Sequence, residues 1–319
     1  MSLSKIAVVI PCYRTAGTIR QVIESVPGFV SNIIVVDDAC PEKSGKIAES
    51  LNLEKVCVIY HEKNQGVGGA MVSGYRRALE LGCDVAAKMD GDGQMDPAYL
   101  EKLIEPVLEG RADYAKGNRF VDFRALRKMP KTRLFGNNVL SFLEKLYSGY
   151  WNIMDPTNGY TAIGRGVLEK LNLSKIAKGY FFESHMLLHL NLLNAVVADV
   201  SIPARYGGEN SSLSIGRAVW GFPPRLLAGL FKRIFFKYFI YDFNMASIYL
   251  LIGVPLFLWG VLFGLYEWID SCITGVPKTA GTIMVAALPL ILSVEMLLQA
   301  IHIDIHNTPH SGRGSGCRE

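Results

Sequence analysis

Cysteine is scarce in this sequence, and the six cysteines that occur follow no metal-binding pattern. No two of them form a Cys-x-x-Cys pair, so we expect neither a zinc site nor a disulfide framework, and most thiols should be reduced. Net charge is low as well: +4 over 319 residues does not indicate nucleic-acid binding. The first apolar run, Ile6–Ile10, is short and ends at Pro11, so no signal peptide is expected.

Charged residues are nearly absent from the C-terminal part of the chain. Met245–Tyr266 carries none, and Thr279–Ile301 carries only Glu295. Each run exceeds the roughly 20 residues that cross a bilayer as a helix. We therefore predict transmembrane helices at 245–267 and 279–301, joined by a short polar loop, Glu267–Lys278. Glu295 would lie either near the cytoplasmic interface or packed between the helices, where it could bind a neighbouring helix or subunit.

Aromatic and basic residues are interleaved just before these runs, and Arg217–Lys237 contains five Lys or Arg. That composition is typical of helices that lie in a membrane interface with their cations toward lipid phosphates, although a buried amphipathic helix has a similar pattern. The polar loop has one basic residue, Lys278. By the positive-inside rule, the N-terminal domain and both termini are expected in the cytoplasm, which predicts a multi-pass protein of the cell membrane.

Residues 1–213 alternate between short apolar runs, rich in β-branched residues, and stretches with helical spacing. The expected strands are Lys5–Ile10, Asn32–Asp38, Lys55–Tyr60 and Cys83–Met89. This alternation predicts an α/β domain with a doubly wound, mostly parallel sheet, whose ligands bind at the carboxyl ends of the strands. We expect this domain at 1–213, interfacial helices at 214–244, the two spans within 245–301 and a cytoplasmic tail at 302–319.

Two carboxylates and an amide follow the fourth expected strand, in Asp90-Gly91-Asp92-Gly93-Gln94. Clustered carboxylates oppose folding unless a cation lies between them, and Mg²⁺ or Mn²⁺ prefers such oxygen ligands. The segment therefore predicts a metal–diphosphate site, with a solvated polar turn as the alternative. Pro11–Tyr13 and Asp38 follow the first two strands, so all three polar clusters are expected at one edge of the sheet.

Two further motifs narrow the kind of ligand. Gly66–Gly69 follows the third strand and does not form G-x-G-x-x-G, so it favours close helix packing beside a nucleotide over NAD binding. A basic cluster that we expect to lack acidic partners consists of Lys116, Arg119, Arg124, Arg127, Lys128, Lys131 and Arg133. Next to a metal–diphosphate site, such a cluster suits a second phosphate, with a solvated loop as the alternative.

Together these motifs resemble the family 2 glycosyltransferases with the GT-A fold, particularly the dolichol-phosphate mannose synthase and polyprenyl-phosphate glycosyltransferase group. The resemblance covers roughly residues 5–210 and, in layout, the membrane hairpin. The motifs that carry it are Val9-Ile-Pro-Cys-Tyr13, Val35-Val-Asp-Asp38, Asn64-x-Gly66-x-Gly68, Asp90-Gly-Asp92-Gly-Gln94, Gly117-x-Arg119 and Asp155-Pro-x-x-Gly159-Tyr160. They are far more specific for the fold than for the sugar.

The resemblance implies roles for individual residues. Those implied to hold the nucleoside and the rest of the donor are Pro11, Tyr13, Asp38, Asn64 and Gly66. Those implied to bind Mg²⁺ or Mn²⁺ at the donor diphosphate are Asp90, Asp92 and Gln94. Those implied to bind the acceptor phosphate or the diphosphate are Arg119, Arg133 and Arg205.

The resemblance and the hairpin together predict an inverting transfer of one sugar from a UDP- or GDP-sugar to polyprenyl phosphate at the cytoplasmic face. The expected catalytic residues are Asp92, Asp155 and Arg119. A phosphate acceptor is largely ionised near neutral pH, because its second pKa is about 6, and needs no strong general base. A hydroxyl acceptor would need one, and Asp155 or Glu183 would be the candidate.

Two other functions remain open at this point. The chain could be a membrane-bound glycosyltransferase that extends a glycan or a lipid-linked saccharide, or a non-catalytic membrane scaffold or lipid-binding protein. The presence of Asp90, Asp92 and Gln94 together favours an enzyme over a scaffold. The lipid bilayer is a partner in each case, and we allow for a homo-oligomer because hairpin-anchored proteins often associate.

Overall fold

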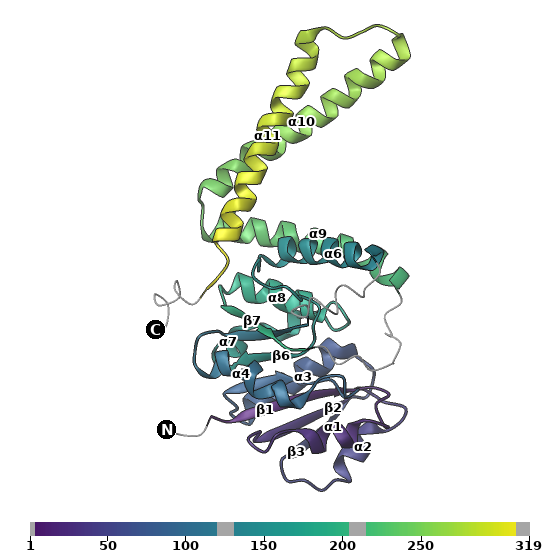
Figure 1. Ribbon diagram of the computed structural model, residues 1–319, viewed down its shortest axis with the longest axis vertical. Coiled ribbons are helices and arrows are strands. Elements are labelled where there is room, and N and C mark those ends of the chain that lie inside the picture. The colour runs from purple at the N-terminus through teal and green to yellow at the C-terminus, as the bar shows by residue number, and fades with distance from the viewer. Residues whose placement is uncertain (1–3, 120–130, 204–214, 311–319) are drawn as a thin grey trace. The chain divides into compact units, whose positions relative to one another are not determined.

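The computed structural model describes residues 4–119, 131–203 and 215–310, and the chain divides into two units. One unit takes in Met1–Leu230 with Pro309–Glu319, and the other is Phe231–Thr308. The first is built on a seven-stranded sheet with the order β3-β2-β1-β4-β6-β5-β7 (Figure 1). The strands are β1 (Ile6–Cys12), β2 (Asn32–Asp37), β3 (Val56–Tyr60), β4 (Val85–Lys88), β5 (Tyr114–Asn118), β6 (Thr161–Gly164) and β7 (Val197–Ser201).

Strand β6 runs antiparallel to its neighbours β4 and β5, whereas the other paired strands are parallel. The expected mostly parallel sheet is therefore confirmed. Both of its faces are covered: in β1, Ala7 and Val9 belong to one buried cluster, and Val8 and Ile10 to the other. Because a strand alternates its side chains between two faces, a strand covered on both sides must be apolar throughout.

Helices from different parts of the chain cover each face. Those on the Val9 side are α3 (Gly66–Glu80), α7 (Arg165–Lys170) and α8 (Phe182–Leu192). Those on the Val8 side are α1 (Ile19–Ser25), α2 (Ser44–Glu49) and α4 (Leu100–Leu108), the last preceded by a 3₁₀ turn at Pro97–Tyr99. A smaller cluster joins α8 to α6 (Lys131–Ser148) through Tyr147, and to α9 (Ile215–Phe235) through Leu226. A short 3₁₀ turn, Leu173–Lys175, follows α7.

The sequence predicted that the first strand ends at Pro11, and this prediction is wrong. β1 continues to Cys12, and Pro11 is paired with Val36 of β2. The carbonyl of Val9 accepts a hydrogen bond from Met89, so Pro11, two residues later, also turns its backbone toward the β4 side. There β4 has already ended at Lys88, and the missing N–H of proline costs no ladder bond.

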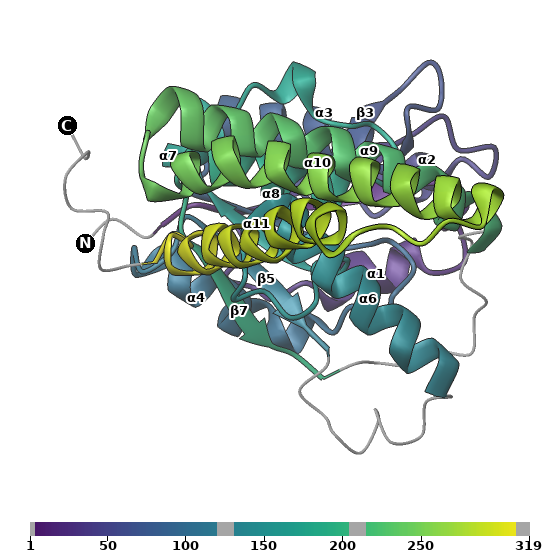
Figure 2. The ribbon, with the colours of Figure 1, turned by 90° about the horizontal axis from the view of Figure 1, so that it is seen from above.

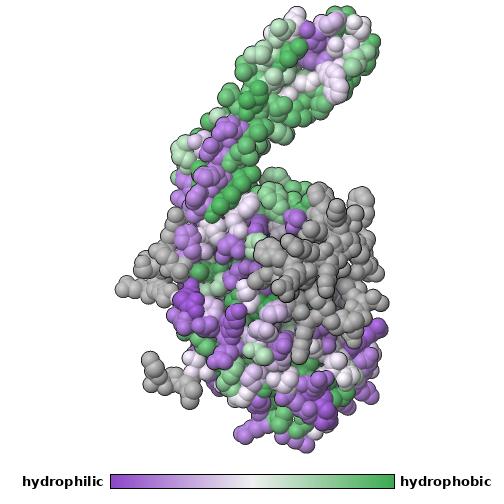
Figure 3. Space-filling model, in the orientation of Figure 1, coloured by the Kyte–Doolittle hydropathy of each residue, from purple (hydrophilic) through white to green (hydrophobic). Residues whose placement is uncertain are grey.

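The second unit is a helical hairpin. A π-helix (Phe236–Tyr241) leads to α10 (Met245–Thr274), and α11 (Ala280–His306) returns beside it, as Figure 1 and Figure 2 both show. Gly260 allows the close approach, since a Cβ there would lie 3.0 Å from the carbonyl oxygen of Ala286. Both helices are long and apolar enough to cross a membrane. Hydrophobic residues cover much of the hairpin on the side seen in Figure 3.

The expected polar loop at Glu267–Lys278 is wrong for its first part. Helix α10 continues through it to Thr274 and ends where Gly275 takes a left-handed conformation, with φ of 68°. The Lys278 ammonium folds back to Glu267 at 2.8 Å and also pairs with Asp270. These ion pairs compensate the acidic charges in the last turns of the helix, and the polar composition of the segment does not prevent it from being helical.

Charged residues of the hairpin also depart from expectation. Arg233 was expected to face lipid phosphates, but its side chain is 1% exposed and donates to the two Asp304 oxygens at 2.7 and 3.0 Å. The Tyr238 hydroxyl donates to the same carboxylate at 2.6 Å. Glu295 is exposed and accepts from Gln299 at 2.9 Å, so it is not packed between α10 and α11.

Candidate active site

The acidic turn after β4 is held against the loop that follows β1. The Thr18 hydroxyl donates to the Gly91 carbonyl at 2.6 Å. Asp92 Oδ1 accepts from the backbone N–H of Gln94 at 3.0 Å. A Cβ on Gly91 would lie 3.3 Å from the Cys12 sulfur. Because β1 and β4 are parallel neighbours, their carboxyl ends meet, and Asp90 and Asp92 lie at the sheet edge that the sequence indicated.

A buried lysine that the sequence analysis did not single out lies beneath this turn. Lys88 closes β4 with its side chain 2% exposed, and Nζ lies 3.1 Å from Asp90 Oδ1 and 2.9 Å from Glu183 Oε1. Burial acts to lower the pKa of Lys88, but the two carboxylates outweigh it and the pKa is raised. Burial also raises the pKa of Asp90, against the opposing effect of Lys88. The signal in the sequence was a lone lysine at the end of an apolar strand.

Arg119 has an acidic partner, contrary to the expectation for the basic cluster. Its Nε donates to Asp155 Oδ2 at 2.7 Å and its Nη2 to Asp155 Oδ1 at 3.1 Å. The Asp155 side chain is fully buried, whereas that of Arg119 is 44% exposed. Such a two-point pair fixes the plane of the guanidinium, which remains partly exposed. Asp155 therefore orients Arg119.

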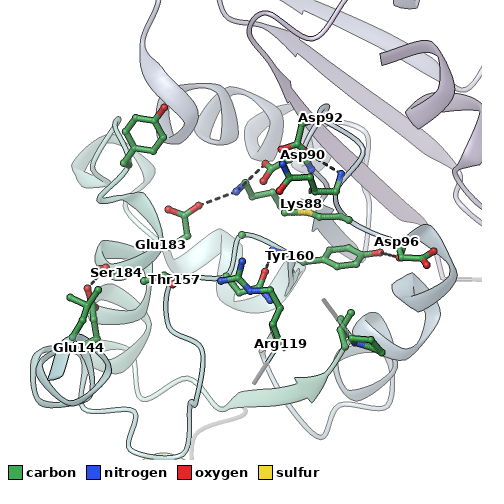
Figure 4. A pocket seen from close by; sticks show the side chains of 18 residues that line it. Lys88, Asp90, Asp92, Asp96, Arg119, Glu144, Thr157, Tyr160, Glu183 and Ser184 are labelled. Carbon is green, nitrogen blue, oxygen red and sulfur yellow. Dashed lines mark hydrogen bonds and ion pairs between the residues drawn. The ribbon is translucent and has the colours of Figure 1, made fainter. Parts of the chain in front are cut away.

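These groups border one pocket of about 260 Å³. Its lining includes Asp90, Asp92 and Gln94 from the acidic turn, together with Arg119 and Glu183. Figure 4 shows Glu183 pointing to Lys88 on the side of the acidic turn, with Arg119 across the pocket from it. The pocket thus joins a carboxylate end to a guanidinium, and it lies wholly within the first unit.

The donor set at the acidic turn fits a hard divalent cation. No group of three or more His, Cys, Asp or Glu that could hold a metal occurs in the described parts of the chain. Asp90, Asp92 and Gln94 offer two carboxylates and one amide, and all three line the pocket. Mg²⁺ is commonly bound through one or two carboxylates, with substrate phosphates and water completing its coordination.

A second cluster lies at the end of β2. Asp38 accepts from the Gln65 and Gly66 amides at 2.8 and 2.7 Å, and Gly66 also donates to Asn64 Oδ1 at 3.1 Å. The ring of His61, which sequence reasoning missed, lies 2.6 Å from Asp38 and 2.8 Å from the Ser73 hydroxyl. Three of the substrate-binding residues that the sequence indicated, Asp38, Asn64 and Gly66, are thus brought together at the start of α3.

The remaining residues indicated by the sequence are placed as follows. Pro11 lies in β1, and Tyr13, just beyond its end, is 44% exposed. Neither they nor the Asp38 cluster line the 260 Å³ pocket. Arg133 belongs to α6, but its side chain lies outside the described ones, and Arg205 lies outside the described residues.

The mixed sheet with one reversed strand, and the acidic turn at the end of a central strand, define a GT-A glycosyltransferase fold. A solved structure with this fold is glucosyl-3-phosphoglycerate synthase from Mycobacterium tuberculosis in complex with uridine diphosphate. It matches 72% of this chain and 80% of its own, with a TM-score of 0.53 and 21% identity.

The chain belongs to glycosyl transferase family 2, whose family model matches residues 7–172. The UDP-N-acetylglucosamine–dolichyl-phosphate N-acetylglucosaminyltransferase of Methanococcus voltae is 32% identical over 216 residues, 63% of this chain and 86% of the relative. The undecaprenyl-phosphate mannosyltransferase of Micrococcus luteus is 31% identical over 240 residues, 69% of this chain and 96% of the relative. The protein is a glycosyltransferase.

Proposed function

We propose that this glycosyltransferase transfers one sugar from a UDP- or GDP-sugar to the phosphate of a polyprenyl carrier. The observation that carries the proposal is one pocket with two carboxylates at one side and Arg119 at the other, in a chain that also has two helices long enough to cross a membrane. Relatives named for dolichyl-phosphate and undecaprenyl-phosphate acceptors support the same acceptor class.

The donor would bind at the carboxyl ends of β1, β2 and β4. In this proposal Asp90, Asp92 and Gln94 hold Mg²⁺ or Mn²⁺, which neutralises the charge that develops on the leaving nucleoside diphosphate. The nucleoside would be held by Pro11, Tyr13, Asp38, Asn64 and Gly66. Asp38 accepts from two backbone amides, so it would also shape the start of α3 beside the nucleotide.

The acceptor phosphate would bind Arg119. Asp155 fixes the guanidinium by two hydrogen bonds, and a fixed guanidinium can hold a phosphate oxygen in line with the anomeric carbon. That oxygen forms the new glycosidic bond as the bond to the diphosphate breaks on the opposite face, so the configuration inverts. Arg133 and Arg205 would add further contacts to phosphate.

Both candidate general bases, Asp155 and Glu183, are paired with a cation. Asp155 is paired with Arg119, and Glu183 with Lys88. Each carboxylate is already engaged by a cation at hydrogen-bond distance, so neither is free to accept a proton from a substrate hydroxyl without giving up that contact. This arrangement supports a phosphate acceptor, which needs no base, over the hydroxyl of a growing glycan.

The membrane arrangement completes the proposal. Helices α10 and α11 would cross the cell membrane, with 214–244 in the interface and the domain at 1–213 on the cytoplasmic side. Both termini would then be cytoplasmic, and the acceptor phosphate would meet the enzyme at the bilayer surface. The bias of basic residues toward Arg217–Lys237 supports this orientation.

The test uses the full chain in lipid vesicles with undecaprenyl phosphate and a panel of UDP- and GDP-sugars. We expect nucleotide release that stops on chelation of divalent cations and falls at least a hundredfold in Asp92→Ala. Glu101→Ala, at an exposed position of α4, serves as the control and should keep full activity. No turnover with any donor, or equal turnover with lipid-free acceptors, would refute the proposal.

A further inference from the structure

One end of the pocket is built from a carboxylate and a hydroxyl that the proposed chemistry does not use. Glu144 of α6 is 2% exposed, and Ser184 of α8 is 6% exposed. The Ser184 hydroxyl donates to Glu144 Oε1 at 2.7 Å. Both residues line the pocket, and Figure 4 shows them together at an end away from Asp90 and Asp92.

The second oxygen of Glu144 is what calls for an explanation. Glu144 Oε2 is buried and receives no hydrogen bond from any described residue. A buried polar atom left without a partner destabilises the fold, and more so when it is charged. The atom itself has almost no accessible surface, but its residue lines the pocket, so a ligand that turns the carboxylate about its last bond can supply the missing donor.

The surroundings define the chemistry of that group. Among the described lining residues there are two cations: Lys88 is engaged by two carboxylates, and Arg119 is held by Asp155 and assigned to the acceptor phosphate. Leu140 and Tyr180 add apolar and aromatic surface to the lining. A carboxylate, a hydroxyl and an aromatic ring in one concave site suit a neutral, hydroxylated ring.

The protonation of Glu144 agrees with such a partner. Burial raises the pKa of Glu144 to about 7, against the opposing effects of Ser184 and Lys116. Near neutral pH the group can therefore accept a hydrogen bond or donate one. A sugar hydroxyl can do both as well, whereas a phosphate oxygen can only accept from it.

We propose that Glu144 and Ser184 form the sugar subsite of the pocket, in which Glu144 Oε2 binds one hydroxyl of the transferred sugar and selects among donors. The inference rests on the proposed function only in that the sugar arrives on a nucleotide. Glu144 acts here in specificity and not at the reacting bond, because it lies away from the acidic turn that would hold the diphosphate.

The experiment measures donor binding to the full chain in detergent, without any acceptor. Calorimetry compares the free nucleoside diphosphate, the nucleotide-sugar that binds best, and its monodeoxy analogues, in wild type and Glu144→Met. The substitution keeps the length of the side chain but removes the acceptor. We expect one deoxy position to lower wild-type affinity about tenfold or more, and Glu144→Met to bind that analogue and the parent donor equally.

Three companion variants keep the result interpretable. Glu144→Gln retains an oxygen acceptor and should keep part of the discrimination. Ser184→Ala leaves the carboxylate but removes its hydroxyl partner, so it tests the subsite even if Glu144→Met fails to fold. Glu101→Met, at an exposed helix position, should behave as wild type.

Two outcomes overturn the subsite. One is an unchanged deoxy penalty in both Glu144→Met and Ser184→Ala. The other is a wild type that binds the nucleoside diphosphate and its sugar derivative equally well. If the coupling is found but no sugar reaches polyprenyl phosphate, the acceptor assignment fails and the subsite stands.

Discussion

Among the described residues of the first unit, two lysines are buried, and their pKa values are shifted in opposite directions. Lys88 lies between the carboxylates of Asp90 and Glu183, and its pKa is raised. Lys116 of β5 is fully buried and donates to the carbonyl of Asn158, a neutral acceptor. Burial lowers the pKa of Lys116 from 10.5 to about 8. A buried ammonium thus keeps its proton firmly only where carboxylates compensate it.

Lys116 gives a prediction for stability at alkaline pH. Its pKa is about 8 in the folded chain and near 10.5 when unfolded, so between these values the unfolded state binds more protons. Stability therefore rises with pH in that window, by about 3 kcal/mol in all, relative to Lys116→Met. Thermal melting in detergent from pH 7.5 to 10 should show that the melting temperature of the wild type rises relative to that of Lys116→Met. Parallel curves would contradict the lowered pKa.

Asp155→Asn separates an orienting role from a basic one. We expect the variant to raise the KM for the lipid acceptor about tenfold or more, because Arg119 loses its charged partner, while kcat changes less and the pH profile keeps its shape. A general base would behave differently: its loss would lower kcat by about 10²–10⁴ and remove the acidic limb of the profile. Steady-state kinetics from pH 5.5 to 8.5 distinguish the two, with Arg119→Lys as the companion variant.

The residues of the site differ in how far the sequence could locate them. Asp90, Asp92 and Gln94 lie within five consecutive residues, so their shared location was readable from the motif. The Arg119–Asp155 pair spans 36 residues and the Lys88–Glu183 pair spans 95. Such partners are chosen by strand order, and no local pattern shows which acid reaches which base.

At the scale of elements, α3 depends on glycine for its close packing against the sheet. A Cβ at Gly74 would lie 2.2 Å from Val9 Cγ1, so the helix packs against β1 more closely than any other residue allows. Gly68 is equally constrained, with the carbonyl oxygen of Ala177 at 2.1 Å from the Cβ position. The Gly66–Gly69 stretch thus serves close packing of the helix that begins at Gly66, as the sequence had indicated.

Gly74→Ala should destabilise the protein by about 1–3 kcal/mol, because the added methyl group overpacks the contact between α3 and β1. Val9→Ala removes the clashing atoms, so the double variant should be more stable than the sum of the two single changes predicts. Gly166→Ala in α7 is the matched control, since nothing lies within 4 Å of its Cβ position. The measurement is the melting temperature of the wild type and of these four variants, and strict additivity of the Gly74→Ala and Val9→Ala effects would contradict the contact.

Element boundaries followed local chemistry only in part. The first four strands, β1 to β4, appear close to their expected places because their apolar runs were uninterrupted. Helix α10 continues several residues past its apolar run and ends at the left-handed Gly275. Charged residues such as Glu267 are compatible with a helix, so the polar composition of Glu267–Lys278 did not locate the helix end.

At the scale of the whole molecule, the two units differ in where their apolar residues lie. In the first unit, apolar residues are sequestered on both faces of the sheet. In the hairpin many large apolar residues are exposed along α10 and α11, and the charged Arg233 is buried against Asp304. An exposed apolar surface of this kind is stable only in an apolar solvent, which supports the proposed membrane insertion.

The proposed topology can be checked with cysteine chemistry. Cys272 is exposed near the end of α10, whereas Cys12, Cys40 and Cys83 are buried. In a Cys57→Ser, Cys317→Ser variant, a membrane-impermeant maleimide should label Cys272 in vesicles whose outer face is the non-cytoplasmic one. Labelling restricted to inverted vesicles would place the turn of the hairpin on the cytoplasmic side and contradict the proposal.

The sequence by itself determined the class of fold, the acidic turn and the two apolar helices, because each depends on residues that are neighbours along the chain. Only the tertiary structure decided which charges compensate one another: Lys88 with Asp90 and Glu183, Arg119 with Asp155, and Arg233 with Asp304. Burying a charge is costly unless an opposite charge is at hand, and strand order together with helix packing sets which one is near. The same packing leaves Glu144 Oε2 without a described partner inside the pocket.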